Sequence, residues 1–160
     1  MNLSGQSVRA PSDFYKIGPE VITAFHDELD LAPGKCRVKQ GGGHAGHNGL
    51  RSIHAHMGEA YGRVRLGIGH PGHKDAVAGY VLHDFAKADQ DWLDDLLRGI
   101  SDGAPALAEG DGARFMNAVA LRTAPPRSST TVEKPAKAAP APVVEPDTRN
   151  PMQKLLDRFK

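Results

Sequence analysis

In the first 121 positions, apolar residues recur with the two-residue period of strands in some segments and with the period of helices in others. A β-branched apolar run at 21–26 predicts a buried strand, and alternation at 36–40 and 63–68 predicts two half-exposed strands. Three other segments repeat their apolar residues at helical spacing: 48–57, 89–100 and 113–121. Strands interleaved with helices predict a single α/β domain over residues 1–121, with a mostly parallel or mixed sheet flanked by helices.

The end of the chain has a different composition. Six of the 12 prolines and no aromatic residue fall within 122–149. Such a segment cannot bury enough apolar surface to offset the entropy of ordering it, so we expect a disordered Pro/Ala-rich tail there. Asn150 and Pro151 then fit the first positions of a short amphipathic helix over 150–160, either a fraying end or a docking helix for a partner.

Composition and charge set further limits. The chain has 160 residues, a net charge of +1 and a single cysteine, Cys36. One cysteine excludes an internal disulfide framework and a zinc site built of several cysteines. No run reaches the roughly 18 apolar residues that span a bilayer, so we expect a cytoplasmic protein without membrane association. Binding to nucleic acid would need a local basic patch, because the total charge is close to zero.

Glycine and histidine are concentrated in the middle of the chain. Ten of the 18 glycines lie within 41–72, and six of the eight histidines lie within 44–73. The loop 41–46 leads into the predicted helix, for which Asn48 is the expected N-cap. Free N–H groups at such a helix start suit an anion, a carbonyl or a carboxylate, although a simple tight turn fits the same pattern.

Several of these histidines raise the question of a metal. His44 and His47 are three residues apart and aspartates precede them, so a zinc site is conceivable. This spacing in a loop does not fix two imidazoles on one ion, and no His-Glu-x-x-His helix is present, so we expect no metal. His54 and His56 lie on different sides of the predicted helix, and we interpret both as solvated residues.

Two carboxylates, Asp27 and Glu28, directly follow the predicted strand 21–26. In open α/β sheets ligands collect at the carboxyl ends of strands, so one of these side chains can point into a binding crevice. A carboxylate there can orient a histidine base and stabilise its charged form. A cap of a turn or helix is the alternative interpretation.

Basic residues occur two apart on two predicted strands, Arg37 with Lys39 and Arg63 with Arg65. Residues two apart on a strand share a face, so each pair forms a patch of two charges. If the strands are neighbours, the patches combine into a clamp for phosphate; otherwise they are solvated surface charges.

Four motifs in order resemble one family closely. They are Asn-Leu-Ser-Gly at 2–5, His-Asp-Glu-Leu-Asp-Leu at 26–31, Gly-Gly-Gly-His-Ala-Gly-His-Asn-Gly-Leu at 41–50 and Arg-Leu-Gly-Ile-Gly-His-Pro-Gly at 65–72. Together they resemble bacterial peptidyl-tRNA hydrolase, and the resemblance extends from Met1 to about Leu121.

The resemblance implies a fold and a reaction. The family has a single α/β domain with a twisted mixed sheet between helices, and it cleaves the ester between a peptide and its tRNA. This recycles peptidyl-tRNA that has left the ribosome. A histidine acts as general base on a water molecule, without metal or other cofactor. We accordingly expect peptidyl-tRNA as the partner, and a monomeric protein of the cytoplasm that serves translation.

The resemblance also implies roles for individual residues. Asp27 matches the aspartate that supports the catalytic histidine, and Asn2 matches an asparagine that lines the site. Asn48 matches a second asparagine, which binds the peptide main chain and positions water, with His47 beside it. Two basic positions that meet tRNA phosphate are matched by Lys39 and Arg65.

One part of the family's pattern has no counterpart here. In the family the general-base histidine and another active-site asparagine lie upstream of the Asn-Leu-Ser-Gly motif, which begins at Asn2 in this sequence. None of the eight histidines matches that base, so we interpret the sequence as N-terminally truncated, by a mis-assigned start or a true deletion. We expect little hydrolysis from this chain, and a non-catalytic tRNA- or RNA-binding remnant is the alternative function. We also expect Pro11 to break the helix that follows the motif.

Overall fold

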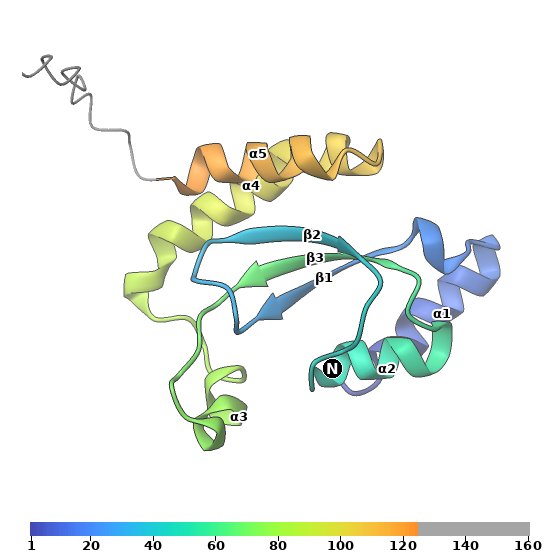
Figure 1. Ribbon diagram of the computed structural model, residues 1–160, viewed down its shortest axis with the longest axis horizontal. Coiled ribbons are helices and arrows are strands. Elements are labelled where there is room, and N and C mark those ends of the chain that lie inside the picture. Colours follow the sequence, from blue (N-terminus) through green and yellow to red (C-terminus); the bar gives the residue numbers. More distant parts are fainter. Residues whose placement is uncertain (125–160) are drawn as a thin grey trace, which may run out of the picture. The chain divides into compact units, whose positions relative to one another are not determined.

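The computed structural model describes residues 1–124, and a three-stranded sheet lies at its centre (Figure 1). The strands are β1 (Thr23–Glu28), β2 (Cys36–Gln40) and β3 (Gly62–Gly67), in the order β1-β3-β2. β1 runs parallel to β3, and β2 runs antiparallel to it. The predicted α/β architecture with a mixed sheet is confirmed.

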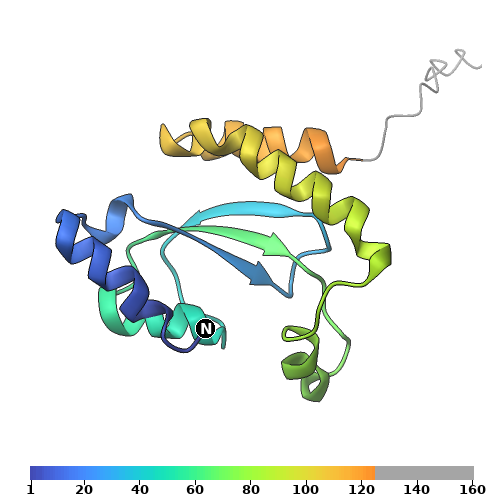
Figure 2. The same cartoon turned by 180° about the vertical axis from the view of Figure 1, so that it is seen from behind.

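Helices flank this sheet. Their bounds are α1 (Ser4–Tyr15), α2 (Asn48–Met57), α3 (Val77–Tyr80), α4 (Gln90–Ala108) and α5 (Gly112–Thr123), with 3-10 turns at Pro19–Val21, Lys74–Ala76 and Lys87–Asp89. In Figures 1 and 2, α1 and α2 lie together on one side of the sheet, and α4 and α5 lie on the other. Within residues 1–124 no helix is long and apolar enough to cross a membrane.

Buried apolar residues form two cores, one on each side of the sheet. The core next to α4 and α5 consists of Cys36, Val64, Leu96, Phe115 and Val119. The core next to α1 and α2 consists of Leu50, Ile53 and Tyr61, with Val8, Ile22, Ala24 and Met57 packed against them. Because side chains alternate along a strand, Val64 faces the first core, and its neighbours Arg63 and Arg65 face the side of α2.

Cys36 belongs to the first core. Its side chain is buried, and burial raises the pKa of the thiol to about 11, against a smaller opposing effect of the Arg37 charge. The thiol is therefore protonated at neutral pH.

β1 lies two residues further along the chain than predicted. Pro19 opens a 3-10 turn that ends at Val21, and the strand starts at Thr23. The ring of proline fixes φ near −65° and removes an N–H donor, which favours a turn over an extended strand at this point. Asp27 and Glu28 are consequently the last two residues of the strand, and not the residues that follow it.

Two helices extend beyond the predicted bounds. α4 continues past residue 100 to Ala108, and α5 continues to Thr123, so residues 122 and 123 are helical and not part of a tail. Residues 125–149 of the predicted tail and the predicted helix 150–160 lie outside the described residues.

The expectation that Pro11 breaks the first helix is wrong. α1 continues through it to Tyr15, where Lys16 closes the helix in a left-handed conformation. A proline inside a helix costs about 3 kcal/mol. Packing of α1 against α2, which buries Gly5 and Ser12, offsets this penalty.

Phe115 is one of the largest fully buried side chains of the first core. Its side chain is fully buried, so Phe115→Ala should leave a cavity and lower the free energy of unfolding by about 3–5 kcal/mol. Leu121 on the same helix is 83% exposed, and Leu121→Ala should change that free energy by less than about 0.5 kcal/mol. Urea denaturation of both variants measures these free energies of unfolding. Equal decreases in the two variants would contradict the assignment of Phe115 to the core.

Candidate functional site

A cavity of about 480 Å³ lies where the carboxyl end of β1, the glycine loop 41–46 and the α3 segment come together. Its titratable lining consists of His26, Asp27, Glu28, His44 and His47. Its cationic lining consists of Lys39, Arg63, Arg65 and Lys74, and its apolar lining includes Met1, Leu29, Leu50, Val77 and Val81. Acidic, basic and apolar groups therefore meet in one space.

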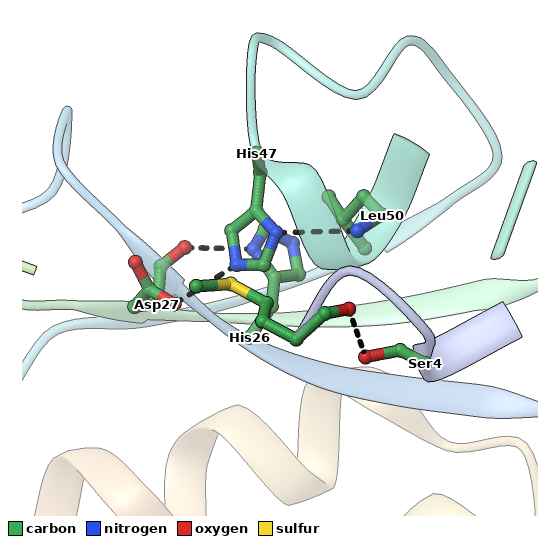
Figure 3. A network of polar contacts seen from close by, with 6 residues as sticks. Ser4, His26, Asp27, His47 and Leu50 are labelled. Atoms are coloured by element: carbon green, nitrogen blue, oxygen red, sulfur yellow. Dashed lines mark hydrogen bonds and ion pairs between the residues drawn. The ribbon is translucent and has the colours of Figure 1, made fainter. Parts of the chain in front are cut away.

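His47 connects the strand end to the helix start in this cavity (Figure 3). Its Nε2 lies 2.9 Å from Asp27 Oδ1, and its Nδ1 accepts a hydrogen bond of 3.2 Å from the backbone N–H of Leu50. Because Nδ1 accepts, the ring proton is on Nε2, which donates to the carboxylate. The hydrogen bond from His47 is the main reason that the pKa of Asp27 is lowered, and burial opposes it.

The N-cap of α2 is His47, so the prediction of Asn48 as the cap is wrong. His47 has extended backbone angles, and its ring nitrogen takes the place of the usual side-chain oxygen of a capping residue. Asn48 is the first residue of the helix, and its exposed side chain lines the cavity. The sequence motif contains two adjacent residues that can cap, and spacing alone does not distinguish them.

The occupied nitrogens limit what His47 can do in this geometry. A general base needs a nitrogen lone pair that can take a proton from water. The lone pair on Nδ1 is used by the Leu50 N–H, and Nε2 carries the proton shared with Asp27. His47 in this arrangement orients Asp27 and the helix, and it has no free acceptor.

His26 is a second histidine at this point that sequence analysis did not single out. Its Nδ1 donates to the main-chain oxygen of Asp27 at 2.8 Å, which leaves Nε2 as an acceptor. That Nε2 is buried and has no hydrogen-bond partner among the described residues. Burial is the main cause that lowers the pKa of His26, so the ring is neutral at pH 7. Its ring lies edge-on to that of His47, with centroids 5.3 Å apart.

The basic residues of β2 and β3 lie on one face, because the two strands are neighbours. Lys39 is opposite Arg63 in the register, and Arg37 is opposite Arg65. Residues directly opposite each other in adjacent strands point to the same side. The predicted strands are therefore neighbours and the four side chains share a face, although they differ in exposure.

Arg65 is held by a carboxylate. Its Nε donates to Glu28 Oε2 at 2.8 Å, and both side chains are largely buried. Burial raises the pKa of Glu28, but the hydrogen bonds from Arg65 and from the backbone of Asp30 outweigh it, and the pKa lies below its usual value. Glu28 is therefore ionised at neutral pH and fixes the direction of the Arg65 guanidinium.

The interpretation of His54 as a solvated residue is wrong. Its side chain is only 9% exposed, and its Nε2 lies 2.8 Å from Arg63 Nη2. The helix face that carries it packs toward Tyr61, whose ring contacts that of His54. His56 is half-buried, with its Nδ1 donating to the Ser52 carbonyl at 2.8 Å. Helical spacing alone could not locate His54, because its burial depends on a side chain from β3.

Asn2 is the candidate residue that the structure does not bring to the cavity. It is exposed, and its neighbour Met1 lines the cavity instead. The Ser4 hydroxyl donates a 2.7 Å hydrogen bond to the Met1 carbonyl, which ties the start of the chain to α1.

The histidines do not form a metal centre within residues 1–124. No group of three or more His, Cys, Asp and Glu side chains lies close enough there to hold an ion. His47 binds Asp27, and His44 uses its Nδ1 to accept a 3.1 Å hydrogen bond from the backbone of Gly46.

Replacing His47 tests the link to Asp27. His47→Ala removes the hydrogen bond that lowers the pKa of Asp27, so this pKa should rise toward or above its usual 3.8. In the unchanged chain the folded pKa is below that of the unfolded state. The pair therefore stabilises the fold above about pH 4, and this is lost as the pH falls through the folded pKa.

Carboxyl carbon chemical shifts of Asp27, followed by NMR from pH 2 to 7, measure this pKa. His44→Ala is the matched control, because His44 lies in the same loop and does not touch Asp27. An unchanged Asp27 titration in His47→Ala would show that the imidazole does not set this pKa.

The sequence matches a set of known proteins. A family model described as peptidyl-tRNA hydrolase matches residues 1–127. The peptidyl-tRNA hydrolase of Ruegeria pomeroyi is 67% identical over 175 residues, which cover all of this chain and 73% of that protein. The one from Cereibacter sphaeroides strain KD131 is 72% identical over 161 residues, which cover 72% of its length.

A solved structure shows the same fold. The crystal structure of peptidyl-tRNA hydrolase from Acinetobacter baumannii superimposes with a TM-score of 0.68 at 46% sequence identity. The match covers 74% of this chain, which spans only 61% of the length of that structure. The resemblance seen in the sequence is confirmed, and the chain belongs to the peptidyl-tRNA hydrolase family.

Proposed function

We propose that this chain binds peptidyl-tRNA in the cavity and serves the hydrolysis of the ester between the peptide and the tRNA. The observation that carries the proposal is the Asp27–His47 pair, 2.9 Å apart, inside a cavity that is bordered by a row of cations. Cations bind the phosphates of a tRNA, and polar side chains held in fixed positions can orient an ester or the water that attacks it. Membership of the family supports the same substrate.

The tRNA would be held mainly by Lys39 and Arg65. Lys39 is exposed on the edge strand β2, and its ammonium can contact phosphate as a point charge. Arg65 uses Nε for Glu28, which leaves its two terminal nitrogens for a bidentate phosphate contact. The Glu28 carboxylate thus serves to aim the guanidinium.

The peptide end would meet Asn48. Its amide is exposed at the first position of α2 and lines the cavity, and it offers both a donor and an acceptor. These are the groups needed to bind a peptide main chain and to place a water molecule. Asn2 stays a prediction for the same region, because its exposed side chain does not line the cavity.

The group that would take a proton from the attacking water is the least well defined part of the site. Asp27 binds the His47 imidazole, but both nitrogens of His47 are engaged. His26 has a free Nε2, but among the described residues its ring is held by the main-chain oxygen of Asp27 and by no carboxylate. Loss of a general base typically costs about 10²–10⁴ in rate. We therefore propose that residues 1–160 keep the substrate site and have low turnover.

Single-turnover hydrolysis of an N-blocked aminoacyl-tRNA tests this expectation. Residues 1–160 should react about 10²–10⁴-fold more slowly than the Ruegeria pomeroyi relative under the same conditions. Asp27→Asn should lower the remaining rate further. An equal rate in both proteins would contradict the assignment, and it would mean that the proton is taken by His26 Nε2 or by a His47 that exchanges its partners.

A second candidate function is a non-catalytic RNA-binding role, because four cations share one strand face. The two functions predict different affinities of the cavity for peptidyl-tRNA and for deacylated tRNA. A hydrolase site should bind peptidyl-tRNA more tightly than deacylated tRNA, since the ester and the peptide enter the cavity. Equal affinity for the two, with no hydrolysis, would favour the RNA-binding role. Either role fits the expected cytoplasmic location and monomeric state.

Salt dependence tests the phosphate contacts. Lys39→Ala should weaken tRNA binding and reduce the slope of log K against log salt by about one, because one phosphate contact is lost. Arg98→Ala is the control, since Arg98 is an exposed cation on α4 and lies on the other side of the sheet. Equal effects of the two substitutions would mean that tRNA does not use the cationic face.

A further inference from the structure

Arg63 differs from the other cations on its strand face because it is buried. It is 3% exposed, and no Asp or Glu of residues 1–124 forms an ion pair with it. An unneutralised charge inside a protein is costly unless hydrogen bonds compensate it. Its cross-strand neighbour Lys39 is exposed, so the two residues have different surroundings despite their shared face.

The contacts of Arg63 all lie within the protein. Nη1 donates to the Gly43 carbonyl at 2.7 Å, and Nη2 donates to His54 Nε2 at 2.8 Å. The guanidinium carbon lies 5.1 Å from the centre of the Tyr61 ring, where a cation–π interaction adds to the binding. Its Nε is buried and has no hydrogen-bond partner within residues 1–124. These contacts leave little of the guanidinium for a phosphate.

The Gly43 contact lies in the middle of a loop whose first residue is also bound, since the Gly41 N–H donates to the Tyr61 carbonyl at 3.0 Å. Within loop 41–46, the backbone of Gly41, Gly42, Ala45 and Gly46 is in the left-handed region. Ala45 with φ of 45° is a strained position for a residue with a side chain. A Cβ placed on Gly43 or on Gly46 would meet no other atom within 4 Å. A glycine-rich backbone has many alternative conformations, so a fixed contact in its middle restricts it strongly.

The loop ends at the residue that organises the cavity. His47 follows Gly46 directly and bonds both to Asp27 and to the N–H of Leu50. A shift of the loop backbone therefore moves the imidazole and the start of α2, where Asn48 lies. The Gly43 carbonyl is the point at which the central strand of the sheet reaches this loop.

We propose that Arg63 is a positioning residue, which anchors the glycine loop through the Gly43 carbonyl and so places His47 and Asn48 in the cavity, and that it does not contact tRNA phosphate. His54 completes the anchor by accepting the second hydrogen bond. It can accept because Nε2 carries no proton, while Nδ1 faces the Glu59 carboxylate at 3.6 Å. The effect of this anchor on catalysis rests on the proposed function, whereas the anchoring of the loop by Arg63 is independent of it.

Hydrogen exchange in the free protein tests the anchor without any substrate. The amide of His47 donates to the His44 carbonyl, and the amide of Leu50 donates to His47 Nδ1. In Arg63→Gln both amides should exchange at least about tenfold faster, because a charge-assisted hydrogen bond to the loop is lost. The amides of Val64 and Phe115 report on the core and should stay as protected as before.

Lys39→Gln is the matched control, because it removes the neighbouring charge from the same face. It should reduce the salt slope of tRNA binding by about one and leave the exchange of His47 and Leu50 unchanged. Arg63→Gln should do the opposite: the amides of His47 and Leu50 should exchange faster, and the salt slope of tRNA binding should stay unchanged. Arg63→Lys should recover part of the protection, since a lysine can still donate to the Gly43 carbonyl.

The proposal is overturned if Arg63→Gln reduces the salt slope of tRNA binding and leaves the amide exchange of His47 and Leu50 unchanged, because Arg63 would then be a phosphate ligand.

If Arg63→Gln also loses protection in the core, two milder variants, His54→Gln and His54→Leu, test the anchor instead. Glutamine keeps an acceptor for Nη2 and should preserve the loop, whereas leucine should increase loop exchange with the core intact. Unchanged loop exchange in His54→Leu with an intact core would contradict the anchor. Absence of tRNA binding in every variant would reject the proposed function only.

Discussion

The double hydrogen bond of His47 is the contact on which the geometry of the site depends. One ring nitrogen holds the carboxylate at the end of β1, and the other holds the first turn of α2. Each bond fixes the ring tautomer that the other requires, so the strand end and the helix start are set together. The glycine loop that leads from β2 into α2 supplies little rigidity of its own, so the His47 imidazole links the position of Asp27 to that of Asn48.

Residues that share a strand face can still have opposite roles. Lys39 is on the edge strand β2 and remains in contact with solvent, whereas Arg63 is on the central strand β3 and is covered by the loop and by α2. Arg65, two residues further along, is partly exposed and aimed by Glu28. The same charge thus serves to attract a ligand at one position and to hold the backbone at another, and burial decides which.

Much of the fold follows from the periodicity of the sequence. The strand 36–40, the loop 41–46 and the bounds of α2 at residues 48 and 57 agree with the prediction, because each depends on local turn chemistry or alternation. The choice of His47 over Asn48 as the cap, the burial of His54 and the separate environment of Arg63 could not be read from the sequence. Each depends on which strand is central and on a partner 9 to 20 residues away. The continuous α1 shows the same limit, since tertiary packing outweighs the local effect of Pro11.

The buried state of Cys36 has a consequence for the redox behaviour of the protein. The reactive form of cysteine is the thiolate, and a thiol in the core with a pKa of about 11 forms almost none of it at neutral pH. Oxidants and disulfides therefore find no accessible thiol in this chain, since Cys36 is its single cysteine. Thiol exchange with the surroundings is thus disfavoured at this position as long as the core around Cys36 stays closed.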